Sequence, residues 1–150
     1  MNETNILGAF FKPRQQAIAK YAVEAETIQY KVLRYLLDRA SSTEWGLKYG
    51  YRTIKDYQEF SQRVPVQTYE EIKGYVDRMR HGEKNVLWPG NVVWYAKSSG
   101  TTNDKSKFIP VSKEGLQTVH YAGGRDAVAL YLQQNPKSRI FSGRTLILGG

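Results

Sequence analysis

The sequence of 150 residues contains no cysteine and only two histidines, His81 and His120. Without cysteine, the chain can form neither a disulfide framework nor a thiolate metal site. The two histidines are too far apart in the sequence for a helical motif with two histidine ligands four residues apart. We therefore expect no metal ligand from the protein in this stretch.

Long hydrophobic runs are also missing from the sequence. No stretch approaches the roughly 18 apolar residues that cross a bilayer. A short apolar patch precedes Lys12, whereas a secretory signal carries its positive charge before the apolar stretch. These absences predict a cytoplasmic protein with no membrane partner.

What is present is an ordinary globular composition with an uneven positive charge. Apolar residues make up 41% and charged residues 24%, and the net charge is +8. Residues 1–90 carry 14 basic and 11 acidic side chains, whereas residues 91–150 carry 8 basic and 3 acidic ones. The second part is therefore expected to meet an anionic partner, either a nucleotide phosphate or a nucleic acid.

Helical signals dominate residues 1–90. Pro13 suits the first turn of a helix, and apolar residues recur in steps of three and four from Gln15 to about Ala40. Three capping signals predict shorter helices: Thr43 before Glu44–Lys48, Thr53 before Ile54–Gln62, and a capping box of Thr68 and Glu71 before a helix that reaches Arg80. Gly50 and Gly82 are expected to end the first and last of these.

The pattern changes to strands at residue 91. Val92–Tyr95 and Lys107–Val111 are rich in β-branched and aromatic residues and predict two strands. Pro110 predicts that the second strand lies at a sheet edge, because proline cannot donate to a ladder. Ser112 is expected to cap a helix over Lys113–Gln134.

A third strand is predicted over Thr145–Leu148, close to the end of the sequence. A buried strand needs neighbours on both edges, so three strands make an incomplete sheet. We therefore expect residues 1–150 to be one fragment of a longer chain. Residues 1–90 are mainly helical, and residues 91–150 run strand, loop, strand, helix, strand.

The polar loop between the first two strands is the most informative stretch. Serine and threonine hydroxyls can donate to phosphate oxygens, a glycine lets the backbone approach a ligand, and lysines neutralise charge. The residues that offer these groups are Ser98, Ser99, Gly100, Thr101, Thr102, Lys105 and Lys107. A Walker loop is excluded because it has a different glycine spacing and precedes a helix. A polar hairpin loop without a ligand is the alternative.

Ser98-Ser99-Gly100-Thr101-Thr102, with a lysine five residues later, resembles the first core motif of the adenylate-forming superfamily. The loop is one residue longer than in luciferase-like members, as in the auxin-responsive (Gretchen Hagen) acyl-acid amido synthetases. The similarity to that branch covers most of residues 14–112. The matching pieces are Tyr49-Gly50-Tyr51, Tyr57-Gln58-Glu59-Phe60, Val64-Pro65-Val66, Tyr69-Glu70-Glu71-Ile72, Gly82-Glu83 and Leu87-Trp88-Pro89-Gly90.

The resemblance implies an α/β fold, namely the helix-rich N-terminal portion of an adenylate-forming enzyme with an incomplete sheet. It implies that ATP, with Mg²⁺, activates a carboxylic acid as an acyl-adenylate, and that an amine such as an amino acid then takes the acyl group. The pentapeptide would wrap the β- and γ-phosphates. Lys107 matches the loop lysine and Lys105 assists it. Asp104 is a departure, because many relatives have glycine there.

Several parts of the implied enzyme lie outside these 150 residues. The adenine and ribose contacts and the mobile C-terminal subdomain are among them, so the remainder of the longer chain is an expected partner. We assign no catalytic residue here, and the fragment alone is expected to be inactive.

The helix after the loop carries a second hypothesis. In similar enzymes the corresponding helix lines the pocket for the acyl acid, and Tyr121, Gly124 and Arg125 lie within about one turn of one another. Arg125 could hold a carboxylate through a bidentate pair. The alternative is an exposed arginine beside Asp126. His120 is interpreted as a packed helix residue and not as a base.

Two other function classes compete with the enzyme hypothesis. A non-catalytic or degenerate relative is one. A basic nucleic-acid-binding module is the other, but the basic residues are scattered and form no recognised binding motif. We therefore expect no nucleic-acid partner.

Overall fold

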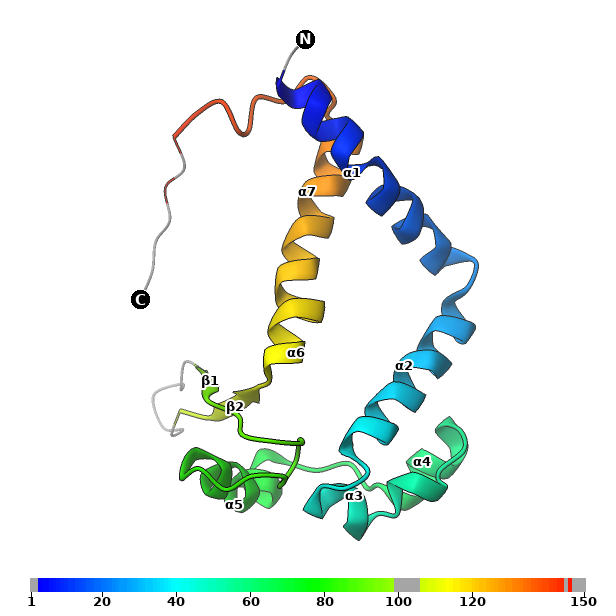
Figure 1. The fold of residues 1–150 in the computed structure, drawn as a ribbon, viewed down its shortest axis with the longest axis vertical. Helices are drawn as coiled ribbons and strands as arrows, with labels where there is room; N and C mark the ends of the chain where they lie inside the picture. The colour runs from blue at the N-terminus through cyan, green and yellow to red at the C-terminus, as the bar shows by residue number, and fades with distance from the viewer. Residues whose placement is uncertain (1–2, 99–105, 145, 147–150) are drawn as a thin grey trace. The chain divides into compact units, whose positions relative to one another are not determined.

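Figure 1 shows the computed structural model of the chain, which describes residues 3–98, 106–144 and 146. The chain forms two compact units. The first unit joins Met1–Ala25 with Thr118–Gly150, and the second unit is Glu26–Gln117. The change from helical to strand pattern at residue 91 therefore falls inside the second unit.

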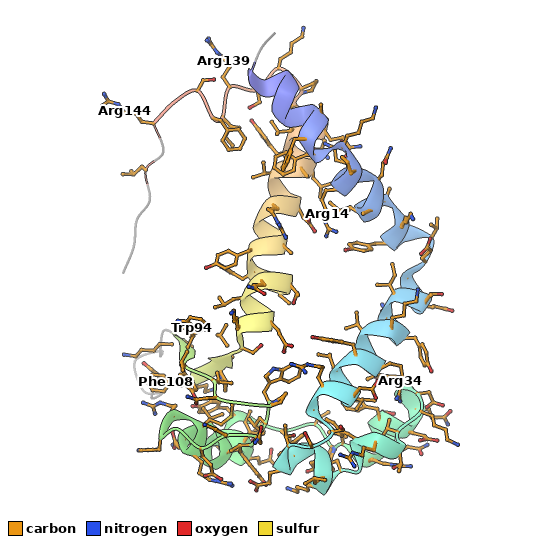
Figure 2. All side chains as sticks on the ribbon, viewed as in Figure 1. Arg14, Arg34, Trp94, Phe108, Arg139 and Arg144 are labelled. Carbon is orange, nitrogen blue, oxygen red and sulfur yellow. The ribbon has the colours of Figure 1, made fainter. Side chains whose placement is uncertain are left out.

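The first unit is built on α1 (Glu3–Ala19), which packs against α7 (Ala122–Gln134). The guanidinium of Arg14 donates to both carboxylate oxygens of Asp126, at 2.5 and 2.6 Å, and Figure 2 shows Arg14 beside α7. The amide of Gln15 donates to the carbonyl oxygen of Ala129 at 2.8 Å. An ion pair and an amide hydrogen bond thus contribute to the packing of α1 against α7.

The predicted single helix over Gln15–Ala40 is wrong. The structure has three pieces there: α1, the short 3₁₀-helix η1 (Lys20–Ala22) and α2 (Ala25–Ala40). The N–H groups of Val23 and Glu24 both donate to the carbonyl of Lys20, at 3.1 and 2.8 Å, and close a turn. Apolar periodicity continues on both sides of this turn, so the pattern could not reveal it. Pro13 lies inside α1 rather than in its first turn.

In the second unit, two of the predicted helices begin at the predicted caps. Thr43 precedes α3 (Glu44–Lys48), and its hydroxyl accepts from the N–H of Gly46 at 3.0 Å. The capping box precedes α5 (Tyr69–Arg80) as expected. Gly50 and Gly82, which follow these helices, have φ values of 65° and 91°, a conformation that favours glycine.

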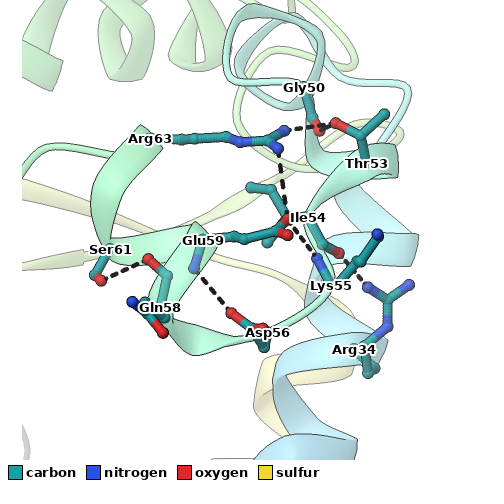
Figure 3. Close-up of polar contacts among 10 residues, drawn as sticks. All are labelled: Arg34, Gly50, Thr53, Ile54, Lys55, Asp56, Gln58, Glu59, Ser61 and Arg63. Atoms are coloured by element: carbon teal, nitrogen blue, oxygen red, sulfur yellow. Dashed lines mark hydrogen bonds and ion pairs between the residues drawn. The ribbon is translucent and has the colours of Figure 1, made fainter.

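The helix predicted to start after Thr53 begins later. α4 spans Tyr57–Arg63, and Asp56 caps it by accepting from the N–H of Glu59 at 2.9 Å. Thr53 instead ends the 3₁₀-helix η2 (Tyr51–Thr53), where its hydroxyl donates to the carbonyl of Gly50 and accepts from Arg63 (Figure 3). Both residue types cap helices well, so tertiary contacts decided between them.

The sheet has two antiparallel strands among the described residues, β1 (Trp94–Lys97) and β2 (Phe108–Val111). Trp94 pairs with Val111, and Lys97 pairs with Phe108. β1 therefore begins two residues later than predicted. Val92 is buried instead, in a cluster with Met79 and Val86.

Helical backbone follows β2 from Lys113 to Gln134, as predicted, in three consecutive segments. These are α6 (Lys113–Gly115), the π-helix η3 (Leu116–Tyr121) and α7. The Ser112 hydroxyl accepts from the N–H of Gly115 at 2.9 Å and caps the first segment. Of the predicted third strand, Thr145, Ile147 and Leu148 lie outside the described residues, and Leu146 is 84% exposed.

Among the described residues, most of the buried side chains belong to the second unit. Its buried apolar residues are Leu37, Ala40, Trp45, Ile54, Val76, Met79, Val86 and Val92. In the first unit, Ala129 and Leu132 of α7 are buried. Within the described part of the chain, the helices are too short or too polar to cross a membrane.

Candidate functional site

Ser98 and Lys107 stand at the two ends of the predicted phosphate loop, and the structure brings them together. The N–H of Ser98 donates to the carbonyl of Lys107 at 2.9 Å. The N–H of Lys107 donates to the Ser98 hydroxyl oxygen at 3.1 Å. This pair, which we call the stem, continues the β1–β2 ladder by one step. A hydroxyl that accepts one hydrogen bond can still donate one, so the stem suits a phosphate oxygen.

The other predicted loop residues, Ser99, Gly100, Thr101, Thr102 and Lys105, lie outside the described residues. The structure therefore brings together the two ends of the predicted set.

Two side chains of α5, Tyr69 and Arg80, contact the strand beside the stem, and neither is among the residues predicted for the site. The N–H of Phe108 donates to the hydroxyl of Tyr69 at 3.0 Å, and the ammonium of Lys107 lies 5.8 Å from the centre of the Tyr69 ring. The guanidinium carbon of Arg80 lies 3.7 Å from the centre of the Phe108 ring. No local pattern signals these contacts, because 39 residues separate Tyr69 from Phe108.

The three residues predicted for the acyl acid are exposed on one helical stretch. Tyr121 ends η3 and is 60% exposed, and Gly124 and Arg125 lie in the first turn of α7. A methyl group added at Gly124 would meet no atom within 4 Å. The three positions therefore share an open surface.

Asp126, next to Arg125, binds Arg14 through both of its oxygens. The hydrogen bonds from Arg14 lower the pKa of Asp126 and outweigh the effect of its burial, and Arg125 adds only a weaker attraction. The principal partner of Asp126 is thus Arg14 and not the neighbouring Arg125. The side chain of Arg125 is exposed.

Both histidines lie at exposed positions. Nδ1 of His81 lies 2.7 Å from the carbonyl of Asp77 at the end of α5. His120 contacts the ring of Tyr121, with ring centres 5.4 Å apart, but it is exposed. The prediction that His120 is packed is therefore wrong. Among the described residues, histidines and carboxylates form no cluster of three or more that could hold a metal ion.

A cleft of about 280 Å³ in the second unit was not foreseen. It is lined by Arg39, Trp88, Pro89, Asn91, Val92, Ser112, Lys113 and Glu114. The carboxylate of Glu114 accepts from Arg39 at 2.5 Å, from the Trp88 indole at 2.9 Å and from the Tyr35 hydroxyl at 3.2 Å. Burial acts to raise the pKa of Glu114, but these hydrogen bonds outweigh it and lower the pKa. The carboxylate is thus a junction between α2, the loop before β1 and α6.

Comparison with known proteins gives consistent matches. The model of the GH3 family N-terminal domain matches residues 14–148. Indole-3-acetic acid-amido synthetase GH3.6 of Arabidopsis thaliana is 30% identical over 106 residues, which cover 70% of this chain and 17% of the relative. Jasmonoyl-L-amino acid synthetase JAR6 of Nicotiana attenuata is 29% identical over 96 residues, which cover 63% of this chain and 17% of the relative.

A solved structure is also similar. AtGH3.15 acyl acid amido synthetase in complex with 2,4-DB matches with a TM-score of 0.65 and 30% identity, over 73% of this chain and 19% of the other. The helix-rich fold with its small sheet is thus that of the N-terminal region of such a synthetase. In each case the match covers less than a fifth of the relative's length.

Proposed function

The chain belongs to the GH3 family, and from this premise we propose that the whole protein activates a carboxylic acid with ATP and transfers the acyl group to an amine. The family match over residues 14–148 is the observation that carries the proposal. The relatives are named as amido synthetases that act on indole-3-acetic acid or form jasmonoyl-amino acids. An acyl acid and an amino acid are accordingly the proposed substrate classes.

The proposed reaction has two balanced steps. A carboxylate oxygen of the acid attacks the α-phosphorus of ATP, and pyrophosphate leaves as the acyl-adenylate forms. The amine nitrogen then attacks the acyl carbon, loses a proton and displaces AMP. Positioning and charge stabilisation are the main tasks of the protein in such a transfer.

The loop residues are proposed to hold the β- and γ-phosphates. The set is Ser98, Ser99, Gly100, Thr101, Thr102, Lys105 and Lys107. The stem supports this role because it places a hydroxyl and a lysine at the base of one loop. Mg²⁺ would neutralise phosphate charge, and it usually binds through substrate phosphates with few protein carboxylates. That preference fits the hydroxyl-rich donor set.

Tyr121, Gly124 and Arg125 are proposed to contact the acyl acid. The exposed guanidinium of Arg125 suits a carboxylate, and the open space at Gly124 leaves room for an apolar body. The test is Arg125→Ala, with Arg139→Ala as a matched control on the exposed segment after α7 (Figure 2). We expect the Michaelis constant for the acid to rise only in the first variant. If the Michaelis constant for the acid is the same in Arg125→Ala and in Arg139→Ala, Arg125 does not contact the acid.

The function itself is tested by acid-dependent ATP–pyrophosphate exchange with the whole protein. We expect exchange with at least one acid of a panel that includes aryl and indolyl acids. Lys107→Ala should raise the Michaelis constant for ATP about tenfold or more, because a charge-assisted contact with phosphate is lost. Lys31→Ala, on the exposed face of α2, should leave this constant unchanged. An absence of exchange with every acid would favour a non-catalytic relative.

A further inference from the structure

We propose that Tyr69 is a positioning residue that fixes the stem of the phosphate loop and directs Lys107 toward the nucleotide. The proposal rests on the proposed function, because Lys107 matters for nucleotide binding only if the loop holds phosphates. Its structural part concerns residues that the structure describes, and it can be tested separately.

The register of the two strands leaves the N–H of Phe108 free to bond outside the sheet. Ser98 and Lys107 form a hydrogen-bonded step of the antiparallel ladder, so the N–H of the next residue, Phe108, points away from β1. Pro110 has the same orientation two residues on, and it has no N–H. Of the residues 108–110, Phe108 is therefore the one whose backbone N–H points away from β1 and can donate. The Tyr69 hydroxyl accepts this hydrogen bond at 3.0 Å.

The Tyr69 side chain also contacts Lys107. The ammonium of Lys107 lies 5.8 Å from the centre of the Tyr69 ring, within the range of a cation–π interaction. The hydroxyl of Tyr69 therefore fixes the backbone beside the stem, while its ring attracts the charged end of Lys107. Two different parts of one residue act on two consecutive positions, so they can be removed one at a time.

Tyr69 lies on a helix that is anchored at several points. It is the first residue of α5, and Arg80, the last residue, stacks on the Phe108 ring at 3.7 Å. Both ends of the helix thus contact one residue of β2. The capping box fixes the start of α5, and Val76 and Met79 in its second half are buried. A residue on such an element can hold a neighbouring loop within the tolerance that binding needs.

The test compares Tyr69→Phe, which removes the hydroxyl and keeps the ring, with Tyr69→Leu, which removes both. Tyr57→Phe is the control, because Tyr57 is 71% exposed on α4. Because Tyr69→Phe loses one hydrogen bond, we expect amide exchange at Phe108 to become about fivefold faster in this variant without nucleotide.

In the whole protein we expect the Michaelis constant for ATP to rise about fivefold in Tyr69→Phe and further in Tyr69→Leu, with the Michaelis constant for the acid unchanged.

The outcomes separate the two proposals. If the wild type supports no ATP–pyrophosphate exchange with any acid, the proposed function fails, and amide exchange at Phe108 still decides whether Tyr69 holds the stem. If the wild type is active and both Tyr69 variants keep the wild-type constant for ATP, the positioning role is refuted. Equal rises in the constants for ATP and acid, with a lower melting temperature, would also refute it, because they indicate general loosening of the fold.

Discussion

At the scale of single residues, Gly46 shows how closely two segments of backbone approach each other. It is buried in α3, and a methyl group added to it would lie 2.0 Å from the carbonyl oxygen of Ala40. That oxygen belongs to the main chain at the end of α2, so it cannot swing aside as a flexible side chain would. The position therefore needs glycine for space and not for a special backbone angle.

We predict that Gly46→Ala lowers the free energy of unfolding by about 3 kcal/mol, at the upper end of the cost of overpacking. Gly74→Ala in α5 is the matched control, because a methyl group there meets no atom within 4 Å. The control should be neutral or stabilise by up to about 1 kcal/mol, since alanine favours a helix over glycine. Urea unfolding of both variants measures the difference. Similar stabilities for the two would contradict the close approach.

At the scale of the element, the start of α3 depends on one buried hydroxyl. Thr43 is fully buried; its hydroxyl donates to the carbonyl of Ala40 at 2.7 Å and accepts from the N–H of Gly46 at 3.0 Å. Thr43→Val keeps the shape and leaves both backbone groups without this partner. We expect a loss of about 1–3 kcal/mol in unfolding free energy, measured by denaturant unfolding. Thr43→Ser, which keeps the hydroxyl, should lose clearly less.

The pairing of α1 with α7 should depend on pH through Asp126. Its pKa is lowered chiefly by hydrogen bonds from Arg14, so the ion pair stabilises the fold above about pH 4 and is lost as pH falls through the lower folded-state pKa. Asp126→Asn should therefore reduce the fall in melting temperature between about pH 5 and about pH 2. Glu24→Gln, at an exposed carboxylate, should leave that fall unchanged. Circular dichroism at a series of pH values measures both.

At the scale of the whole molecule, the division into two units predicts that a destabilising substitution in one unit speeds amide exchange in that unit and not in the other. Ile54 is fully buried in the second unit, where its carbonyl also accepts from Arg34. Ile54→Ala should cost about 2–5 kcal/mol and speed amide exchange in α2, α4 and α5. We expect exchange in α1 and α7 to stay near the wild-type rate, because these helices have their own buried residues and ion pair. Val66→Ala, at a side chain that is 98% exposed, is the control.

The sequence by itself determined features that depend on local chemistry. The caps at Thr43, Thr68 and Ser112, the helical stretch over Lys113–Gln134, and the two strands around the loop all follow from residue type and spacing. The loop motif and the spaced pieces before it were enough to identify the family. These features could be predicted because their stabilising contacts lie within a few residues.

The tertiary structure decided what depends on residues far apart in the chain. The turn after Lys20, the choice of Asp56 over Thr53 as a cap, and the later start of β1 all fall where local signals are balanced. The contact of Tyr69 with the strand after the loop has no local signal, because a hydrogen bond between distant residues exists only once the helix has packed. The free energy of such contacts comes from the folded arrangement, and a local pattern does not contain it.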